Sequence, residues 1–261
     1  ILNKAIPVIS DDTIDPDFGT GCVKITPAHD FNDYKLGKKH NLDFINILNK
    51  NGTFNNNVSG IFKDKNIHKS RSEVIGQLKE LGSLDKIEDY KTTVPMGERS
   101  GEIIEPLLTD QWFMKMDDLA QLGIDAVKKS NIKFVPKNWE KIYFNWLNNI
   151  EDWCISRQIW WGHRIPAWYD DNGNVYVGDN EQEIRDKNNI SEGINLIQDQ
   201  DVLDTWFSSS LWPFTTMGWP ENTKELEKYY PTSVLVTGFD IIFFWVARMV
   251  MMGIKFLDKV P

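Results

Sequence analysis

The first stretch whose residue types could do chemistry covers residues 18–34. Gly19 and Gly21 make a Gly-x-Gly turn, a short apolar run follows, and a proline break leads to Asp30 at the mouth of a helix. A helix start carries partial positive charge, so Asp30 most simply caps that helix. Asp33, one turn further in, could instead point at a bound cation such as the ammonium of an amino acid, although a single aspartate is more often solvated.

A second stretch, residues 152–169, is rich in aromatic residues and carries Arg157, His163 and Arg164. Core packing with a few exposed polar handles is the favoured interpretation of these aromatics, and a stacking platform for sugars or bases is the alternative. His163 predicts no metal site, because neither a cysteine nor a second histidine lies within ligand spacing.

Two further stretches lie near the carboxyl end of the chain. Asp204 and Trp206 alternate as if at the end of a strand, and a run of serines after them suits a helix start. The β-branched run at residues 233–237 leads into Gly238, and Asp240 then opens a strongly apolar helix. Strand, glycine turn and helix form the unit of a parallel sheet, where ligands bind at strand ends. The plainer interpretation of Asp240 is a helix cap.

The bulk properties exclude several classes of protein. A formal net charge of -9 over 261 residues argues against a protein that grips nucleic acid along its whole surface. Cys22 and Cys154 have no partner pattern for a disulfide framework or a metal, which indicates a reducing cytoplasm. The apolar stretch at residues 241–254 is too short to span a bilayer and contains Arg248, so it predicts a buried helix and no membrane segment. The amino-terminal residues include no initiator methionine and do not resemble a signal peptide, so we expect the chain to be a piece of a longer protein.

Two domains are predicted, with a boundary near residues 96–101. Residues 1–100 combine short apolar bursts with two helices, at 32–40 and 70–81, and so predict a compact α+β unit. Residues 101–261 predict helices at 117–129 and 139–149, a hairpin within 165–177 and the apolar helix after Asp240. The predicted fold class is α/β.

Taken as a string, the first stretch resembles the editing domain of valyl-tRNA synthetases. The matching motifs are Gly19-Thr20-Gly21, Lys24-x-Thr26-Pro27-Ala28-His29-Asp30 and Asp33-Tyr34. The resemblance implies that Asp33 holds the amino group of a mischarged threonine and that Phe18, Lys24 and Thr26 line the pocket. It places His29 and Asp30 at the same substrate site with less definite roles.

The later stretches resemble blocks of the class I catalytic core in the same family. Residues 152–169 are very close to the valyl version of the block that follows the editing insertion, which implies tRNA contacts for Arg157 and Arg164. By resemblance, Trp206 walls the valine pocket, Asp240 and Ile241 contact valine, and Thr237, Gly238 and Asp240 hold the adenylate region of ATP. Residues 170–178 contain no cysteine where some relatives carry a zinc loop, so no zinc is expected.

The implied fold is half of a class I Rossmann-like parallel-sheet catalytic core, with part of an inserted α+β/β-barrel editing domain before it. The implied reaction joins valine to tRNA(Val) through valyl-adenylate, with the Mg²⁺ complex of ATP as substrate. The implied enzyme also hydrolyses mischarged threonyl-tRNA(Val). The expected partners are tRNA(Val), valine and ATP, with no obligate protein partner and no membrane.

The motifs that are missing also matter. The sequence contains no His-Ile-Gly-His-like turn and no Lys-Met-Ser-Lys-Ser-like loop, so the isolated chain is expected to catalyse neither reaction. An isoleucyl- or leucyl-tRNA synthetase is the nearest alternative, and residues 24–30 together with residues 160–164 weigh against it. A sugar-cleaving enzyme would need two carboxylates that converge in one cleft, and no spacing in the sequence identifies such a pair. A module that binds single-stranded RNA would need a basic face, whereas this chain is acidic overall.

Overall fold

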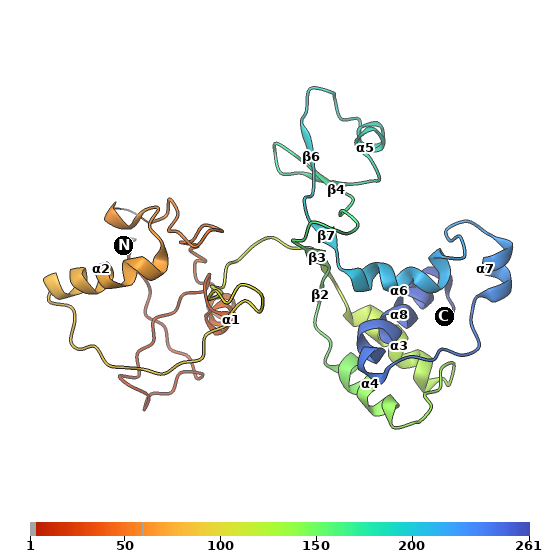
Figure 1. The fold of residues 1–261 in the computed structure, drawn as a ribbon, viewed down its shortest axis with the longest axis horizontal. Helices are drawn as coiled ribbons and strands as arrows, with labels where there is room; N and C mark the ends of the chain where they lie inside the picture. Colours follow the sequence, from red (N-terminus) through yellow and green to blue (C-terminus); the bar gives the residue numbers. More distant parts are fainter. Residues whose placement is uncertain (1–3, 59) are drawn as a thin grey trace. The chain divides into compact units, whose positions relative to one another are not determined.

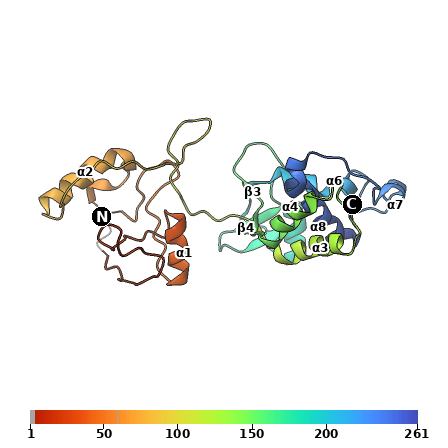
Figure 2. The same ribbon diagram turned by 90° about the horizontal axis from the view of Figure 1, so that it is seen from below.

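The computed structural model describes residues 4–58 and 60–261, which form two compact units that meet at Asp110 and Gln111 (Figures 1 and 2). The change in composition placed this boundary earlier, at residues 96–101. The first unit extends further because Leu107 packs against its core and the carbonyl of Pro106 contacts His29. Contacts made in three dimensions therefore set the boundary, and composition does not report them.

Two helices organise the first unit. Helices α1 (Phe31–Lys39) and α2 (Ile67–Glu80) confirm the two helices predicted there. The Asp30 carboxylate accepts hydrogen bonds from the first backbone N–H groups of α1, and Asn66 does the same for α2. A short 3-10 helix, η1 (Gly60–Phe62), completes the described helical elements of this unit. The small core consists of Leu48, Phe54, Val58 and Phe62.

The short strands predicted in the first unit are absent from the described residues. Residues 22–25 and 44–47 have no regular pairing, and only isolated bridges such as Leu48 to Phe54 and Met96 to Ile103 occur in the described part of this unit. A strand exists only where a neighbour accepts and donates its backbone hydrogen bonds. These segments make only single contacts of this kind, such as the backbone N–H of Asn55 with the carbonyl of Ile47 at 2.9 Å.

Four helices build the core of the second unit. Helices α3 (Asp117–Lys128) and α4 (Trp139–Asn148) confirm the predicted pair, and they pack with α6 (Thr205–Thr215) and α8 (Ala247–Leu257) (Figure 1). The shared core includes Met116, Ile124, Tyr143, Leu147, Phe214 and Met251. Two shorter helices, α5 (Glu181–Asn188) and α7 (Lys224–Tyr229), lie outside this bundle.

Three small sheets accompany the bundle. Strand β1 (Phe113–Met114) pairs with β2 (Trp153–Cys154), and β3 (Ser156–Arg157) pairs with β7 (Val202–Leu203). Strand β4 (Ala167–Asp170) lies between β5 (Val175–Val177) and β6 (Leu196–Gln198), and the β4–β5 pair confirms the predicted hairpin. All of these pairs are antiparallel. The chain is therefore a mixed helix and sheet structure.

The parallel sheet predicted for the second unit is not formed within the described residues. Residues 232–238 have no strand assignment, and Val234 and Val236 are 77% and 89% exposed. A parallel strand needs a partner strand along its edge, and none lies beside this segment in the described part of the chain. The β-branched run is therefore unpaired in the described part of the chain.

The apolar helix predicted after Gly238 does form, but it starts irregularly. A 3-10 turn, η2 (Phe239–Ile241), leads into a π-helical turn, η3 (Ile242–Val246), before α8 begins. Such π turns are rare and frequently occur at functional sites. Residues 247–253 of α8 are buried, as predicted. No helix within residues 4–58 and 60–261 is long and apolar enough to cross a bilayer.

Candidate functional site

Asp204 joins the sheet edge to the start of α6. Its carboxylate accepts hydrogen bonds from the backbone N–H of Trp206 at 3.4 Å and from the indole N–H of Trp153 at 2.9 Å. The guanidinium of Arg157 lies 3.0 Å from the same carboxylate. Asp204 is only 5% exposed, so these partners replace the water that a buried carboxylate loses. Trp206 is thereby held at a defined position in the first turn of α6.

Trp206 stacks on Phe244, which belongs to the π turn. Their ring centres lie 5.6 Å apart and the planes differ by 16°. A second link between the same elements is the indole N–H of Trp245, which donates to the carbonyl of Ser209 at 2.9 Å. Aromatic contacts therefore join α6 to the segment that follows Gly238.

The turn at residues 237–241 presents the remaining residues predicted for valine and ATP. Thr237 and Ile241 are half-buried, and Gly238 and Asp240 are exposed. Asp240 lies inside η2 and caps no helix, so the plainer interpretation of this residue is wrong. A Cβ atom on Gly238 would lie 2.4 Å from Oδ1 of Asp240, so glycine is required for the observed position of that carboxylate.

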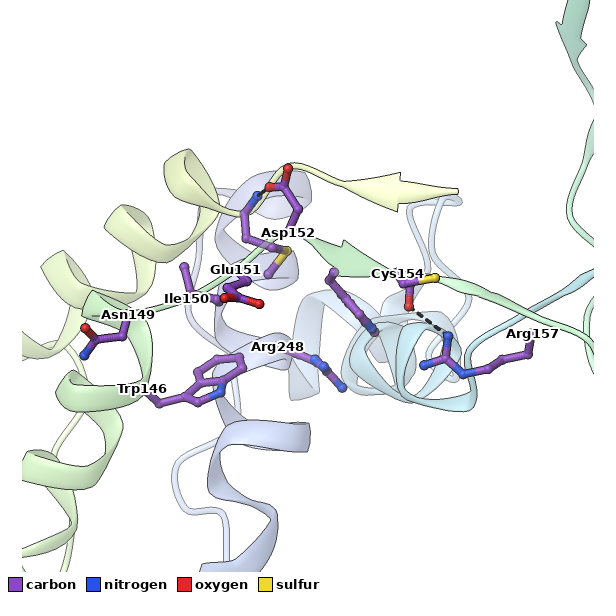
Figure 3. A pocket seen from close by; sticks show the side chains of 10 residues that line it. Trp146, Asn149, Ile150, Glu151, Asp152, Cys154, Arg157 and Arg248 are labelled. Carbon is purple, nitrogen blue, oxygen red and sulfur yellow. Dashed lines mark hydrogen bonds between the residues drawn. The ribbon is translucent and has the colours of Figure 1, made fainter. Parts of the chain in front are cut away.

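Arg248 reaches a cavity of about 450 Å³ beside this region (Figure 3). Its guanidinium lies 3.8 Å from the centre of the Trp153 ring and donates to the carbonyl of Phe244 at 3.3 Å. The cavity is also lined by Trp146, Ile150, Glu151, Asp152, Cys154 and Arg157. Burial lowers the pKa of Arg248 to about 10, so its side chain stays charged at neutral pH.

The two arginines predicted to contact tRNA both have partners within the chain. Arg157 donates to the carbonyl of Cys154 at 2.8 Å (Figure 3). It also donates to the carbonyl of Ser156 at 2.9 Å and contacts Asp204. Arg164 makes three hydrogen bonds, to the carbonyl oxygens of Gln198 and Asp199. Both guanidinium groups therefore tie loops together in this structure.

The aromatic stretch divides into a buried part and an exposed part. Trp153 is buried, whereas Trp160 and Trp161 are exposed, so core packing is wrong for that pair within the described residues. The loop that carries them is held at its end, where Leu203 donates its backbone N–H to the carbonyl of His163 at 2.7 Å. Local sequence could not separate the two groups, because all three residues are tryptophan in one aromatic run.

In the first unit, Asp33 and Thr26 form a local pair. The Asp33 carboxylate oxygen Oδ2 accepts the backbone N–H of Thr26 at 2.7 Å and its hydroxyl at 3.1 Å. Asp33 is half-buried in the first turn of α1. The arrangement presents a carboxylate of fixed orientation, which suits the recognition of a small cation.

The other residues predicted for the editing pocket have diverse surroundings. Asp30 caps α1, and Lys24 and Phe18 are exposed. His29 contacts the carbonyl of Pro106 through Nδ1 at 3.0 Å and accepts the backbone N–H of Ile47 through Nε2 at 3.0 Å. Since both ring nitrogens have backbone partners, the contacts select the tautomer with the proton on Nδ1 and give His29 a structural role.

Sequence reasoning missed the roles of Asp204, Phe244 and Arg248. An aspartate before Thr-Trp at the end of an apolar pair is a helix-cap signal that could have identified Asp204. A lone arginine in an apolar helix was visible at Arg248, but its partner Trp153 lies far away in the sequence. The described residues contain no group of three His, Cys, Asp or Glu side chains able to hold a metal ion.

Comparison with known proteins identifies the class. The family model of class I tRNA synthetases (I, L, M and V) matches residues 33–261. The match covers most of the chain, which therefore belongs to this family.

Three curated relatives with high sequence identity to this chain are valine–tRNA ligases. That of Legionella pneumophila (strain Lens) is 60% identical over 261 residues, that of Francisella tularensis subsp. tularensis (strain SCHU S4 / Schu 4) 58%, and that of Coxiella burnetii (strain RSA 493 / Nine Mile phase I) 56%. Each comparison covers 100% of this chain and 28% of the relative. The chain thus spans little more than a quarter of the length of these proteins.

Proposed function

We propose that this chain is part of an ATP-dependent ligase that joins valine to tRNA(Val). The observation that carries the proposal is the stacking of Trp206 on Phe244, beside the turn formed by residues 237–241. A flat indole next to an apolar helix start is a suitable wall for a short, branched side chain. The identity of 56–60% to valine–tRNA ligases over the whole chain supports the same conclusion.

In the proposed reaction, valine attacks the α-phosphate of ATP, valyl-adenylate and pyrophosphate form, and the valyl group then passes to the terminal adenosine of the tRNA. Positioning and charge stabilisation supply most of the catalysis, because the substrates already contain the nucleophile and the leaving group. Trp206 and Ile241 would contact the valine side chain, Asp240 its ammonium group, and Thr237 and Gly238 the adenylate. ATP would enter as its Mg²⁺ complex, and no zinc is expected.

We assign a second, hydrolytic site to the first unit. A pocket shaped for valine cannot strongly reject threonine, which carries a hydroxyl in place of a methyl, so a separate site must remove threonine from the tRNA. Asp33, oriented by Thr26, would bind the threonine ammonium, and Phe18 and Lys24 would line the pocket. His29 and Asp30 would shape it through the contacts described above.

This assignment covers only part of a working enzyme. Neither ATP signature motif occurs in the 261 residues, so we expect the isolated chain to catalyse neither step. Residues 101–261 would be the second half of the catalytic domain and residues 1–100 the end of the editing domain. The whole enzyme would act in the cytoplasm on tRNA(Val), valine and ATP, without an obligate protein partner.

The test uses the full-length enzyme of which we propose this chain is a part, called the parent below. It measures amino acid-dependent exchange between pyrophosphate and ATP. Valine should support exchange, and isoleucine and leucine should support far less. The isolated chain should support none. Preference for isoleucine or leucine would assign the parent to the nearest alternative, and clear valine-dependent exchange by the isolated chain would refute its predicted inactivity.

A further inference from the structure

Arg248 is a buried cation among the apolar residues of the first turns of α8. It is 8% exposed, and its neighbours in α8 are Ala247, Met249 and Val250, which are also buried. A methionine would fill a similar volume without the free-energy cost of removing a charge from water. Packing alone therefore does not account for an arginine at this position.

The contacts of Arg248 lead to Trp206 by one route through Trp153. The guanidinium lies 3.8 Å from the centre of the Trp153 ring, whose indole N–H donates to Asp204 at 2.9 Å. Asp204 in turn accepts the backbone N–H of Trp206. A cation over an aromatic face is attracted by the ring quadrupole, so this contact fixes the indole that holds Asp204.

A second route passes through Phe244. The guanidinium donates to the Phe244 carbonyl at 3.3 Å, and its centre lies 6.0 Å from the Phe244 ring. That ring stacks on Trp206. Arg248 thus contacts Phe244, which stacks on Trp206, and Trp153, which bonds to the Asp204 carboxylate that accepts the Trp206 backbone N–H.

The charges around Arg248 agree with an internal role. Asp204 stabilises its positive charge and Arg157 opposes it. Asp204 is already paired with Arg157 at 3.0 Å, so one carboxylate serves two guanidinium groups. Nε of Arg248 has no hydrogen-bond partner among the described residues, and the stacking on Trp153 is its closest compensation.

We propose that Arg248 is a positioning residue that sets the Trp206 wall of the valine pocket through Trp153 and Phe244. This inference rests on the proposed function, since it assumes that Trp206 contacts valine. Loss of the guanidinium charge loosens both supports of the wall and weakens valine binding, while ATP binding at residues 237–240 is maintained.

The test uses the full-length parent with Arg248→Met, Arg248→Lys and Arg185→Met. Arg185 is a matched control, because it is a largely buried arginine in the same unit that pairs with Glu181 within α5. In valine-dependent pyrophosphate exchange, Arg248→Met should raise KM for valine about tenfold, the size expected when a desolvated cation–π contact is lost. KM for ATP and kcat should stay near wild type, and Arg248→Lys should recover at least half of the loss on a logarithmic scale.

A second measurement does not depend on the reaction. With 5-fluorotryptophan incorporated in the parent, the resonance of Trp206, assigned with Trp206→Phe, should shift in Arg248→Met and stay in place in Arg185→Met. An unshifted resonance, or a KM for valine within twofold of wild type, would overturn the proposal. Equal rises in the KM for valine and for ATP would also overturn it. A wild-type parent that shows no exchange with valine, but whose Trp206 resonance moves in Arg248→Met, would refute the proposed function and leave the structural link intact.

Discussion

Asp33 and Thr26 are joined by two hydrogen bonds that end on one carboxylate oxygen, Oδ2. Oδ1 makes no hydrogen bond with the described residues. It is therefore the oxygen that would accept a charge-assisted hydrogen bond from a bound ammonium group. In the proposed editing site, Thr26 would hold the carboxylate in place and Asp33 would supply the negative charge.

Asp33→Ala in the full-length parent should slow the deacylation of threonyl-tRNA(Val) by about 100-fold, the scale of a lost charge-assisted contact of about 3 kcal/mol. Valylation should be unaffected, because the proposed synthetic site lies in the other unit. Thr26→Ser is the matched control, since it keeps both hydrogen bonds to Oδ2. Unchanged deacylation in Asp33→Ala would remove this residue from the proposed site.

Two glycines in helices should respond oppositely to alanine. In α1, a Cβ on Gly37 would lie 2.7 Å from Cβ of Pro27, so Gly37→Ala should lower the free energy of unfolding by about 1–3 kcal/mol. In α2, a Cβ added to Gly76 would have no atom within 4 Å. Gly76→Ala should therefore raise the free energy of unfolding by about 0.5–1 kcal/mol. Urea unfolding of the two variants measures both values. A stabilised Gly37→Ala variant would show that α1 does not pack on Pro27.

How much the sequence could predict is shown by the helices and the strands. The helices at α1, α2, α3 and α4 were predictable because caps and apolar spacing are local signals. The extended segments at residues 22–25 and 233–237 were predicted as strands, but pairing depends on neighbours that local sequence does not contain. In the site, the motif positions were predictable, whereas the contacts of Arg248 with Trp153 and of His29 with Pro106 join residues far apart in the sequence.

Asp11 should make the first unit sensitive to acid. Its side chain is 1% exposed and lies 2.7 Å from Lys39 and 2.6 Å from His40. The hydrogen bond from Lys39, then that from His40, holds the pKa of Asp11 well below its ordinary value. The folded state therefore binds a proton less readily than the unfolded state, whose aspartate has a pKa of about 3.9. The stabilisation is fully present above that pH and is lost as the pH falls below it.

Asp11→Asn should accordingly lower the free energy of unfolding at pH 7. It should also reduce the loss of stability between about pH 4 and pH 2. Urea midpoints measured across this range, with Asp12→Asn as a control, provide the comparison. If Asp11→Asn loses stability in acid as steeply as the wild type and Asp12→Asn do, the Asp11 pairs contribute nothing to the acid sensitivity.

The tryptophans of the aromatic stretch should differ sharply in their effect on stability. Trp153→Ala removes a buried ring from the second core and should cost about 3–5 kcal/mol. Trp160→Ala and Trp161→Ala should each change the free energy of unfolding by less than about 0.5 kcal/mol, because both rings are exposed. Chemical denaturation of the chain measures all three. Large losses at residues 160 and 161 would show that their rings pack against the chain.

Gly238→Ala tests the turn before η2. The added methyl would lie 2.4 Å from Oδ1 of Asp240 and must displace that carboxylate. The backbone of Gly238 is in the extended region, with φ of -65°, so alanine itself fits without backbone strain. In the full-length parent, we expect KM for valine and ATP to rise at least about tenfold with little change in stability. Exchange kinetics at the wild-type level would show that the position of Asp240 is irrelevant.

The unpaired run at residues 233–237 has a consequence for how this polypeptide behaves when made alone. It offers a row of free amide donors and carbonyl acceptors flanked by bare valines, which is a template for strand addition. Any other extended chain, including another copy of itself, can hydrogen-bond along that row. Isolated molecules should therefore self-associate as their concentration rises. A charged residue in place of Val236 should keep them monomeric.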